Sequence, residues 1–129
     1  MQGEAAQARA RTLLGVPFRL HGRSPESGLD CIGVIALAYD IQDKAPTGYS
    51  LRTTRPERWI ALLDSLAMRI IEPEIGAVML LQPGAAQLHL GLWTGKSLIH
   101  ADAGLRRVVE TPGTPRWPVV GLWRPHTKD

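Results

Sequence analysis

The sequence predicts an α+β domain, with N-terminal helices packed on a C-terminal antiparallel sheet of about five strands. Helical patterns fill the first half of the chain. Short apolar runs divided by proline and glycine fill the second half. A content of 44% hydrophobic residues in a chain of 129 residues is enough for one core. We therefore predict a single domain over residues 1–129.

Two helices are predicted before the middle of the chain. The first covers Glu4–Leu14, an Ala-rich charged segment that Gly15 and Pro17 bring to an end. The second covers Cys31–Gln42, with Asp30 as its N-cap. Apolar residues cover most of the second segment's circumference, which predicts burial on nearly all sides. Its β-branched residues would also suit a strand, but its length and its alanines favour a helix.

A third helix is predicted from about Pro56 to Met68. The segment TTRPERW offers a threonine cap and a proline near the first turn. Its apolar stripe consists of Trp59, Leu62, Leu63 and Leu66. The runs GAVMLLQ, LHLGLW, SLIHA, RRVVE and PVVGLW then predict the strands of the sheet.

Composition and charge exclude several classes of function. The net charge of +3 is spread over interleaved acids and bases, with no run of Lys or Arg, so no nucleic-acid partner is predicted. No apolar run has the roughly 20 residues of a membrane span. The N-terminus lacks the apolar segment of a signal peptide, which predicts synthesis in the cytoplasm. One cysteine cannot form an internal disulfide, so its thiol is free.

The segment LHLGLWTGKSLIHAD predicts a hairpin that turns at its GK dipeptide. This turn places Trp93 opposite Leu98 and His89 opposite Asp102. Because side chains alternate along a strand, His89 and His100 share one face. They are diagonal neighbours, about 7–8 Å apart at Cα.

Two histidines on one face of a hairpin have three interpretations. They could be half-buried residues with backbone partners. They could be metal ligands, but the chain has no CxxC or HxxxH spacing and no third ligand nearby, so no metal site or other cofactor is predicted. They could be a base and its orienter, which would need a nucleophile.

Cys31 is the one candidate for that nucleophile. A lone cysteine at the start of an apolar segment could be core filler, since free cysteine is among the most buried residue types. At a helix N-terminus, however, backbone amides favour the thiolate, which predicts a reactive thiol with a lowered pKa.

Taken in order, these segments resemble the NlpC-type cell-wall peptidases, the bacterial branch of the papain-like cysteine peptidases. The family pattern G-x-P-Y-x-x-G-G before D-C-S-G is matched by GVPFRLHG before DCIG. The family's G-D before H-V-G-I-Y is matched by IGAVMLL before HLGLW, and its G-x-x-x-I-H-A by GKSLIHA. The likeness runs from about Leu13 to Arg124.

The resemblance implies a papain-like fold and hydrolysis of amide bonds in peptidoglycan stem peptides. By position, Cys31 is the nucleophile, His89 the general base and His100 the orienter. Amides at the helix start would stabilise the oxyanion. Asp30 and Asp102 are expected near the substrate, and Asp102 is a rival orienter because it faces His89 in the predicted register.

Four positions depart from the family pattern. Phe18 replaces a tyrosine whose hydroxyl lines the family's active site, and His21 replaces the first of two glycines. Ile32 replaces the serine after the cysteine, and Ala77 replaces the aspartate of G-D. Phe18 and His21 are expected near the substrate, where His21 could supply a donor that Phe18 lacks. These changes imply a different substrate, a substitute donor or weak activity.

The resemblance also implies a cellular context and leaves three rival functions. Family members of this kind occur in phage-tail or gene-transfer modules, so phage-tail proteins are candidate partners. Delivery to the cell wall would then occur by a phage-like particle, by lysis or by a secretion system. The rivals are a weak or inactive binding module of the same fold, a tail-assembly protein, and an acyltransferase or thioesterase.

Overall fold

A computed structural model describes residues 2–126 of the chain. Within these residues the chain forms three helices, a six-stranded antiparallel sheet and a two-stranded ribbon. The helices are α1 (Gln2–Arg11), α2 (Cys31–Tyr39) and α3 (Pro56–Leu66), and the ribbon pairs β1 (Arg23–Ser24) with β2 (Gly28–Leu29). The sheet contains β3 (Ala67–Ile70), β4 (Val78–Gly84), β5 (Gln87–Trp93), β6 (Ser97–Asp102), β7 (Arg107–Pro112) and β8 (Val119–Pro125). The predicted α+β class is confirmed.

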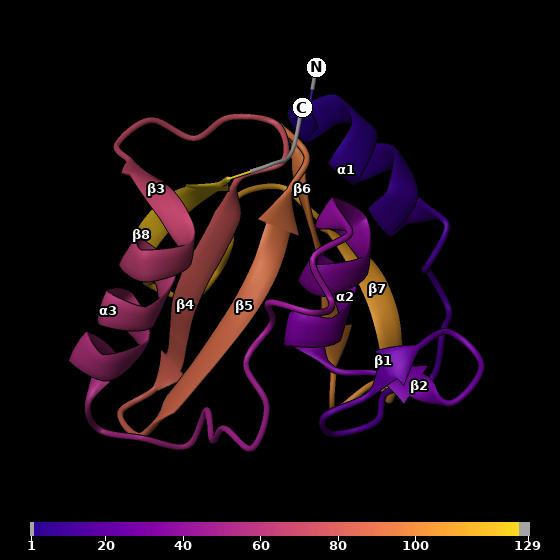
Figure 1. Ribbon diagram of the computed structural model, residues 1–129, viewed down its shortest axis with the longest axis horizontal. Helices are drawn as coiled ribbons and strands as arrows, with labels where there is room; N and C mark the ends of the chain where they lie inside the picture. The colour runs from indigo at the N-terminus through magenta and orange to yellow at the C-terminus, as the bar shows by residue number, and fades with distance from the viewer. Residues whose placement is uncertain (1, 127–129) are drawn as a thin grey trace.

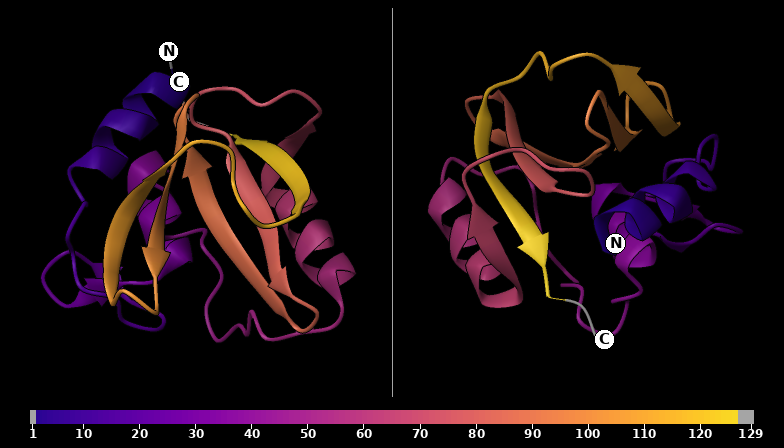
Figure 2. Two further views of the ribbon diagram at one scale, coloured as in Figure 1. Left: turned by 180° about the vertical axis from the view of Figure 1, so that it is seen from behind. Right: turned by 90° about the horizontal axis from the view of Figure 1, so that it is seen from above.

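The helices lie at two different parts of the sheet (Figure 1). Helices α1 and α2 pack against each other, and α2 contacts β5 and β6. Helix α3 packs on β3 and β8, at the other end of the sheet. The view from above in Figure 2 shows that the sheet is strongly curved. The start of α2 therefore lies beside the middle strands, where the hairpin histidines are.

The helices begin near their predicted starts and end earlier than predicted. Helix α1 ends at Arg11 because the chain turns toward Gly15, which has a φ of 88°. Helix α2 begins at Cys31 with Asp30 as its N-cap, as predicted, and ends at Tyr39, where the C-cap Asp40 adopts a left-handed conformation. No part of residues 2–126 forms a helix long and apolar enough to cross a membrane.

The third helix corrects two expectations. Its N-cap is Arg55, with no side-chain capping bond, so the predicted threonine cap is wrong. The helix also stops at Leu66, because the chain enters β3, a strand that the sequence analysis did not predict. This strand pairs only with β8, through positions such as Ala67 opposite Pro125. The sheet therefore has six strands in the described residues rather than about five.

The strand order is β3-β8-β4-β5-β6-β7, so β8, the last strand in residues 2–126, lies between β3 and β4. The main core, between the sheet and the helices, includes Leu80, Leu90 and Trp123. A second cluster, with Met79 and Leu81, occupies the other face of the sheet. Successive residues of β4 thus serve opposite faces, as the pleat of a strand requires.

The β5–β6 hairpin has the predicted register at its turn, with Trp93 paired to Leu98. The two strands pair next to the turn, through Trp93 with Leu98 and Leu92 with Ile99. Farther from the turn, β5 stays paired with β4, where Leu81 lies opposite His89. The two strands therefore separate toward the ends that carry the histidines.

Candidate active site

A cavity of about 740 Å³ lies at the start of α2. Cys31 lines it from the helix, His89 from β5 and Asp102 from the end of β6. Phe18 and Trp117 contribute from loops on either side. A second, apolar cavity of about 60 Å³ between α2 and α3 has no ionisable side chain in its lining. The first cavity, in contrast, brings a cysteine, a histidine and carboxylates together.

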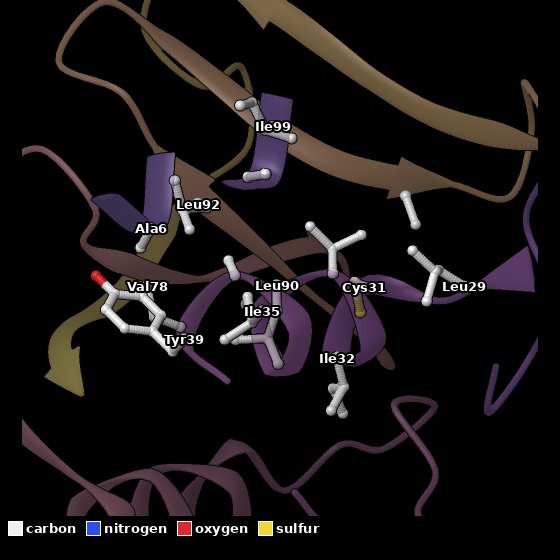
Figure 3. Close-up of a cluster of buried hydrophobic side chains, with 14 of the residues drawn as sticks. Ala6, Leu29, Cys31, Ile32, Ile35, Tyr39, Val78, Leu90, Leu92 and Ile99 are labelled. Atoms are coloured by element: carbon white, nitrogen blue, oxygen red, sulfur yellow. The ribbon is translucent and has the colours of Figure 1, made fainter. Parts of the chain in front are cut away.

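Cys31 is the first residue of α2 and is only 3% exposed. Figure 3 shows its sulfur among the side chains of Leu29, Ile32 and Leu90. Burial, reinforced by the negative charge of Asp30, raises the pKa of the thiol to about 12, although the backbone amides of Leu90, Ile32 and Cys31 itself act in the opposite direction. The expected lowering of this pKa is wrong, because desolvation of a thiolate outweighs the helix amides here.

Asp30 holds the start of α2 in place. Its side chain is buried and accepts hydrogen bonds from the amide of Gly33 at 2.9 Å and from that of His21 at 2.9 Å. The guanidinium of Arg23 pairs with it at 3.1 Å, and the hydroxyl of Tyr49 donates to it. A buried carboxylate with this many donors is well compensated. Asp30 therefore fixes the helix start that carries the cysteine.

His89 and His100 form a hydrogen-bonded pair, with 2.9 Å between Nε2 of His89 and Nδ1 of His100. The other ring nitrogen of His100, Nε2, lies 3.0 Å from Oγ1 of Thr111. The ring of Trp117 packs edge-on against both imidazoles, at 5.6 Å from His89 and 5.9 Å from His100. The structure thus confirms that the two histidines share one face of the hairpin.

Burial, with a smaller effect of the neighbouring His100, lowers the pKa of His89 from 6.5 to about 4, although Asp102 acts in the opposite direction. Burial also lowers the pKa of His100, where Asp102 again opposes and Arg116 adds to the effect. Both imidazoles are therefore neutral at neutral pH. A neutral His89 has a lone pair with which to accept a proton.

The thiol and the imidazole line the same cavity without a direct hydrogen bond between Cys31 and His89 in the described contacts. Cys31 belongs to the main core. The neighbours of His89 on β5, Leu88 and Leu90, belong to the same core, so the side chain of His89 leaves the strand on the opposite face. The cavity lies where β5 and β6 separate, which brings both side chains to it. Catalytic hydrogen bonds are often long in the absence of substrate, so this geometry is compatible with proton transfer.

Comparisons with known proteins find matches by structure but none by sequence. No family model matches the chain, and no curated protein matches it by sequence. Among solved structures, NlpC1 from Trichomonas vaginalis matches with a TM-score of 0.74 and 23% identity, over 98% of this chain and 45% of that chain. RipB, a peptidoglycan hydrolase from Mycobacterium tuberculosis, matches with a TM-score of 0.64 and 20% identity, over 95% of this chain and 64% of that one.

The chain has the NlpC/P60 fold. The NlpC/P60 domain of the peptidoglycan hydrolase SagA also matches, with a TM-score of 0.60 and 20% identity, over 85% of this chain and 88% of that domain. The chain spans less than half the length of NlpC1 and somewhat under two thirds of RipB.

The NlpC/P60 fold brings most of the predicted site residues to the cavity. Cys31, His89, Asp102 and Phe18 line it, together with Asp30. His100 does not line the cavity but is hydrogen-bonded to His89, which does. Asp102 accepts a hydrogen bond from the amide of Leu105 at 3.0 Å, which is the role of a turn-end carboxylate.

His21 does not lie where the sequence analysis expected. Its exposed imidazole bonds to the carbonyl of Tyr49 at 3.0 Å and is not among the residues that line the cavity. The reason is the backbone of His21, which turns with a φ of 61° to direct its amide at Asp30. The idea that this imidazole replaces a donor missing at Phe18 has no support in the geometry.

Sequence reasoning missed four residues of the site, namely Arg23, Tyr49, Thr111 and Trp117. Arg23 and Tyr49 reach Asp30 from outside α2, and no periodic pattern marks them. Thr111 had one available signal: with Leu98 opposite Thr111 in the β6–β7 pairing, it shares a face with His100. Trp117 lies in the loop between β7 and β8, whose path follows from no local pattern.

Acid should destabilise the protein through His89. Because folding lowers this pKa, the unfolded chain binds a proton between about pH 6.5 and pH 4 that the folded chain excludes. The free energy of unfolding is therefore expected to fall by about 3 kcal/mol from neutral pH to about pH 4. Urea unfolding of wild type and of His89→Gln at both pH values measures this fall. His21→Gln, at an exposed histidine, is the control. An equal fall in wild type and His89→Gln would contradict the assignment.

Loss of the Asp30 carboxylate should lower the free energy of unfolding by more than loss of an exposed carboxylate does. Asp30→Ala removes the carboxylate that pairs with the charge of Arg23 and uncaps α2, so it is expected to lower the free energy of unfolding by about 3–5 kcal/mol. Glu74→Ala is the control, because the pair of Glu74 with Arg124 is exposed and contributes at most about 1 kcal/mol. Urea unfolding compares the two variants.

Asp30→Asn should also speed alkylation of Cys31, because it removes a charge that raises the pKa of the thiol.

Proposed function

We propose that this chain is a cysteine peptidase that hydrolyses amide bonds in peptidoglycan stem peptides, with Cys31 as nucleophile, His89 as general base and His100 as orienter. The observation that carries the proposal is one cavity lined by a helix-start cysteine and by a histidine hydrogen-bonded to a second histidine. Support for the substrate comes from SagA and RipB, peptidoglycan hydrolases with the same fold.

The reaction uses the groups of the cavity in two stages. His89 takes the proton of the Cys31 thiol, and the thiolate attacks the carbonyl carbon of the scissile amide. Amides at the start of α2 stabilise the oxyanion, and the His89 imidazolium then protonates the departing amine. Water, activated by the same imidazole, hydrolyses the thioester and releases a carboxylic acid and the free thiol.

The raised pKa of Cys31 indicates when its proton moves to His89. The resting thiol is protonated at neutral pH and the resting imidazole is neutral. The thiolate and the imidazolium therefore form together, once substrate brings the two groups into contact.

The proposal includes a route to the cell wall. Delivery by a phage-like particle, by lysis or by a secretion system would bring the domain to its substrate, with phage-tail proteins as partners in the first case.

Incubation with purified peptidoglycan tests the function. Wild type should release new amino groups from sacculi, whereas the matched Cys31→Ala variant should release none. Sacculi with different stem peptides identify the bond by mass spectrometry of the fragments. Absence of new amines from every sacculus would contradict the proposal.

A weak or inactive module of the same fold is the second candidate. The buried thiol, with its raised pKa and no direct bond to His89, favours it. A generic thioester substrate separates the remaining possibilities. Release of free thiol from the thioester, without new amines from peptidoglycan, would indicate a thioesterase or acyltransferase, and no turnover of either substrate would indicate the inactive module.

A further inference from the structure

The hydroxyl of Thr111 extends the pair of histidines into a chain of three side chains. Thr111 is on β7, and the β6–β7 pairing places His100 opposite Val109, two residues away. Thr111 and His100 are thus diagonal neighbours on one face of the sheet. The 3.0 Å between Oγ1 of Thr111 and Nε2 of His100 continues the 2.9 Å contact between His100 and His89.

Each neutral imidazole in this chain has one donor and one acceptor nitrogen, so the tautomers are linked. Nε2 of His89 is committed to His100, which leaves Nδ1 of His89 to take the thiol proton. Once His89 is an imidazolium, its Nε2–H must donate to Nδ1 of His100. His100 then carries its own proton on Nε2, and the hydroxyl oxygen of Thr111 accepts it.

We propose that Thr111 is a positioning residue that holds the proton of His100 on Nε2 and so keeps Nδ1 of His89 free to accept the proton of Cys31. This inference rests on the proposed function, because it names the nitrogen of His89 that acts as base. Thr111 acts through His100 and is not itself a catalytic residue.

The surroundings of Nε2 make the choice of variant important. His100 is only 2% exposed, and a small cavity of about 20 Å³ beside it is lined by Thr111 and Trp117. Thr111→Ala opens the position of Oγ1 to a water, which then replaces the hydroxyl as acceptor. Thr111→Val fills that position with a methyl group and offers no acceptor there. Thr111→Ser restores the oxygen.

Without an acceptor, the buried Nε2–H of His100 would be unsatisfied, which favours the other tautomer. His100 would then donate from Nδ1 to Nε2 of His89. The proton of neutral His89 would consequently move to Nδ1, where it blocks transfer from the thiol. Thr111→Val is therefore expected to lower kcat about tenfold with KM unchanged, while Thr111→Ser stays near wild type.

Nitrogen-15 NMR of the histidine rings tests the tautomer without any substrate. At neutral pH, wild type and Thr111→Ser should carry the proton of His100 on Nε2, and Thr111→Val should carry it on Nδ1. His89→Gln assigns the signals. A wild-type proton on Nδ1, an unchanged tautomer in Thr111→Val, or a changed tautomer with wild-type kcat would each overturn the inference.

The two measurements separate failure of this inference from failure of the proposed function. If hydrolysis needs Cys31 and Thr111→Val matches wild type in both measurements, the inference alone fails. If the tautomers follow the expectation while wild type and Cys31→Ala release equally few amines, the proposed function fails. The role of Thr111 in catalysis then falls with it.

Discussion

Replacement of Cys31 by alanine is expected to abolish the release of amines from peptidoglycan. The thiolate is the nucleophile of the proposed reaction, so only the oxyanion donors and substrate binding remain in the variant. Such residual sites retain about 10³–10⁴-fold over the reaction in water, far below the turnover of an intact site. Amine release from sacculi, compared at equal concentrations of folded protein, measures the loss.

Cys31 is also a core residue, which makes a control necessary. The side chain is 3% exposed, so removal of its sulfur affects packing as well as chemistry. Cys31→Ser keeps nearly the same size and should be inactive as well, while urea unfolding of both variants should remain cooperative. Wild-type turnover in either folded variant would return Cys31 to a purely structural role.

Replacement of His89 by alanine should lower turnover by about 10²–10⁴-fold, because the thiol proton then has no acceptor. His100→Ala should cost less, since His100 only orients His89 and sets its tautomer. Asp102→Ala should cost least, because its carboxylate is occupied with the amide of Leu105. The kcat of the three variants on one stem peptide gives the order. A larger loss in Asp102→Ala than in His100→Ala would make Asp102 the orienter.

The sequence specified the local part of the fold. The start of α2 followed from Asp30, whose side chain caps Gly33, and the hairpin followed from its turn, with Trp93 opposite Leu98. Strand β3 could not be recognised, because it directly continues α3 and its residue Met68 is exposed. Its strand conformation depends on pairing with β8, which is distant in sequence. Interactions of that kind leave no local pattern.

The site was predictable as a set of residues, but its electrostatics were not. Alternation in one hairpin placed His89 beside His100, which needed only local information. The direction of the Cys31 pKa depended instead on how completely the core encloses the thiol, and on the charge of Asp30. Arg23 and Tyr49 likewise reach Asp30 through tertiary contacts. Desolvation of a side chain depends on the folded structure and cannot be predicted from the spacing of residues in the sequence.

The place of β8 in the sheet has a consequence for how the chain folds. This strand is synthesised after the other strands of the sheet, yet it occupies an interior position between β3 and β4. Until β8 pairs, β3 and one edge of β4 remain unpaired, and the core lacks the fully buried Trp123. Contacts between distant segments form slowly, and unpaired edges invite association with other chains. The nascent domain is thus most exposed to aggregation just before β8 inserts, a period in which a chaperone would protect it.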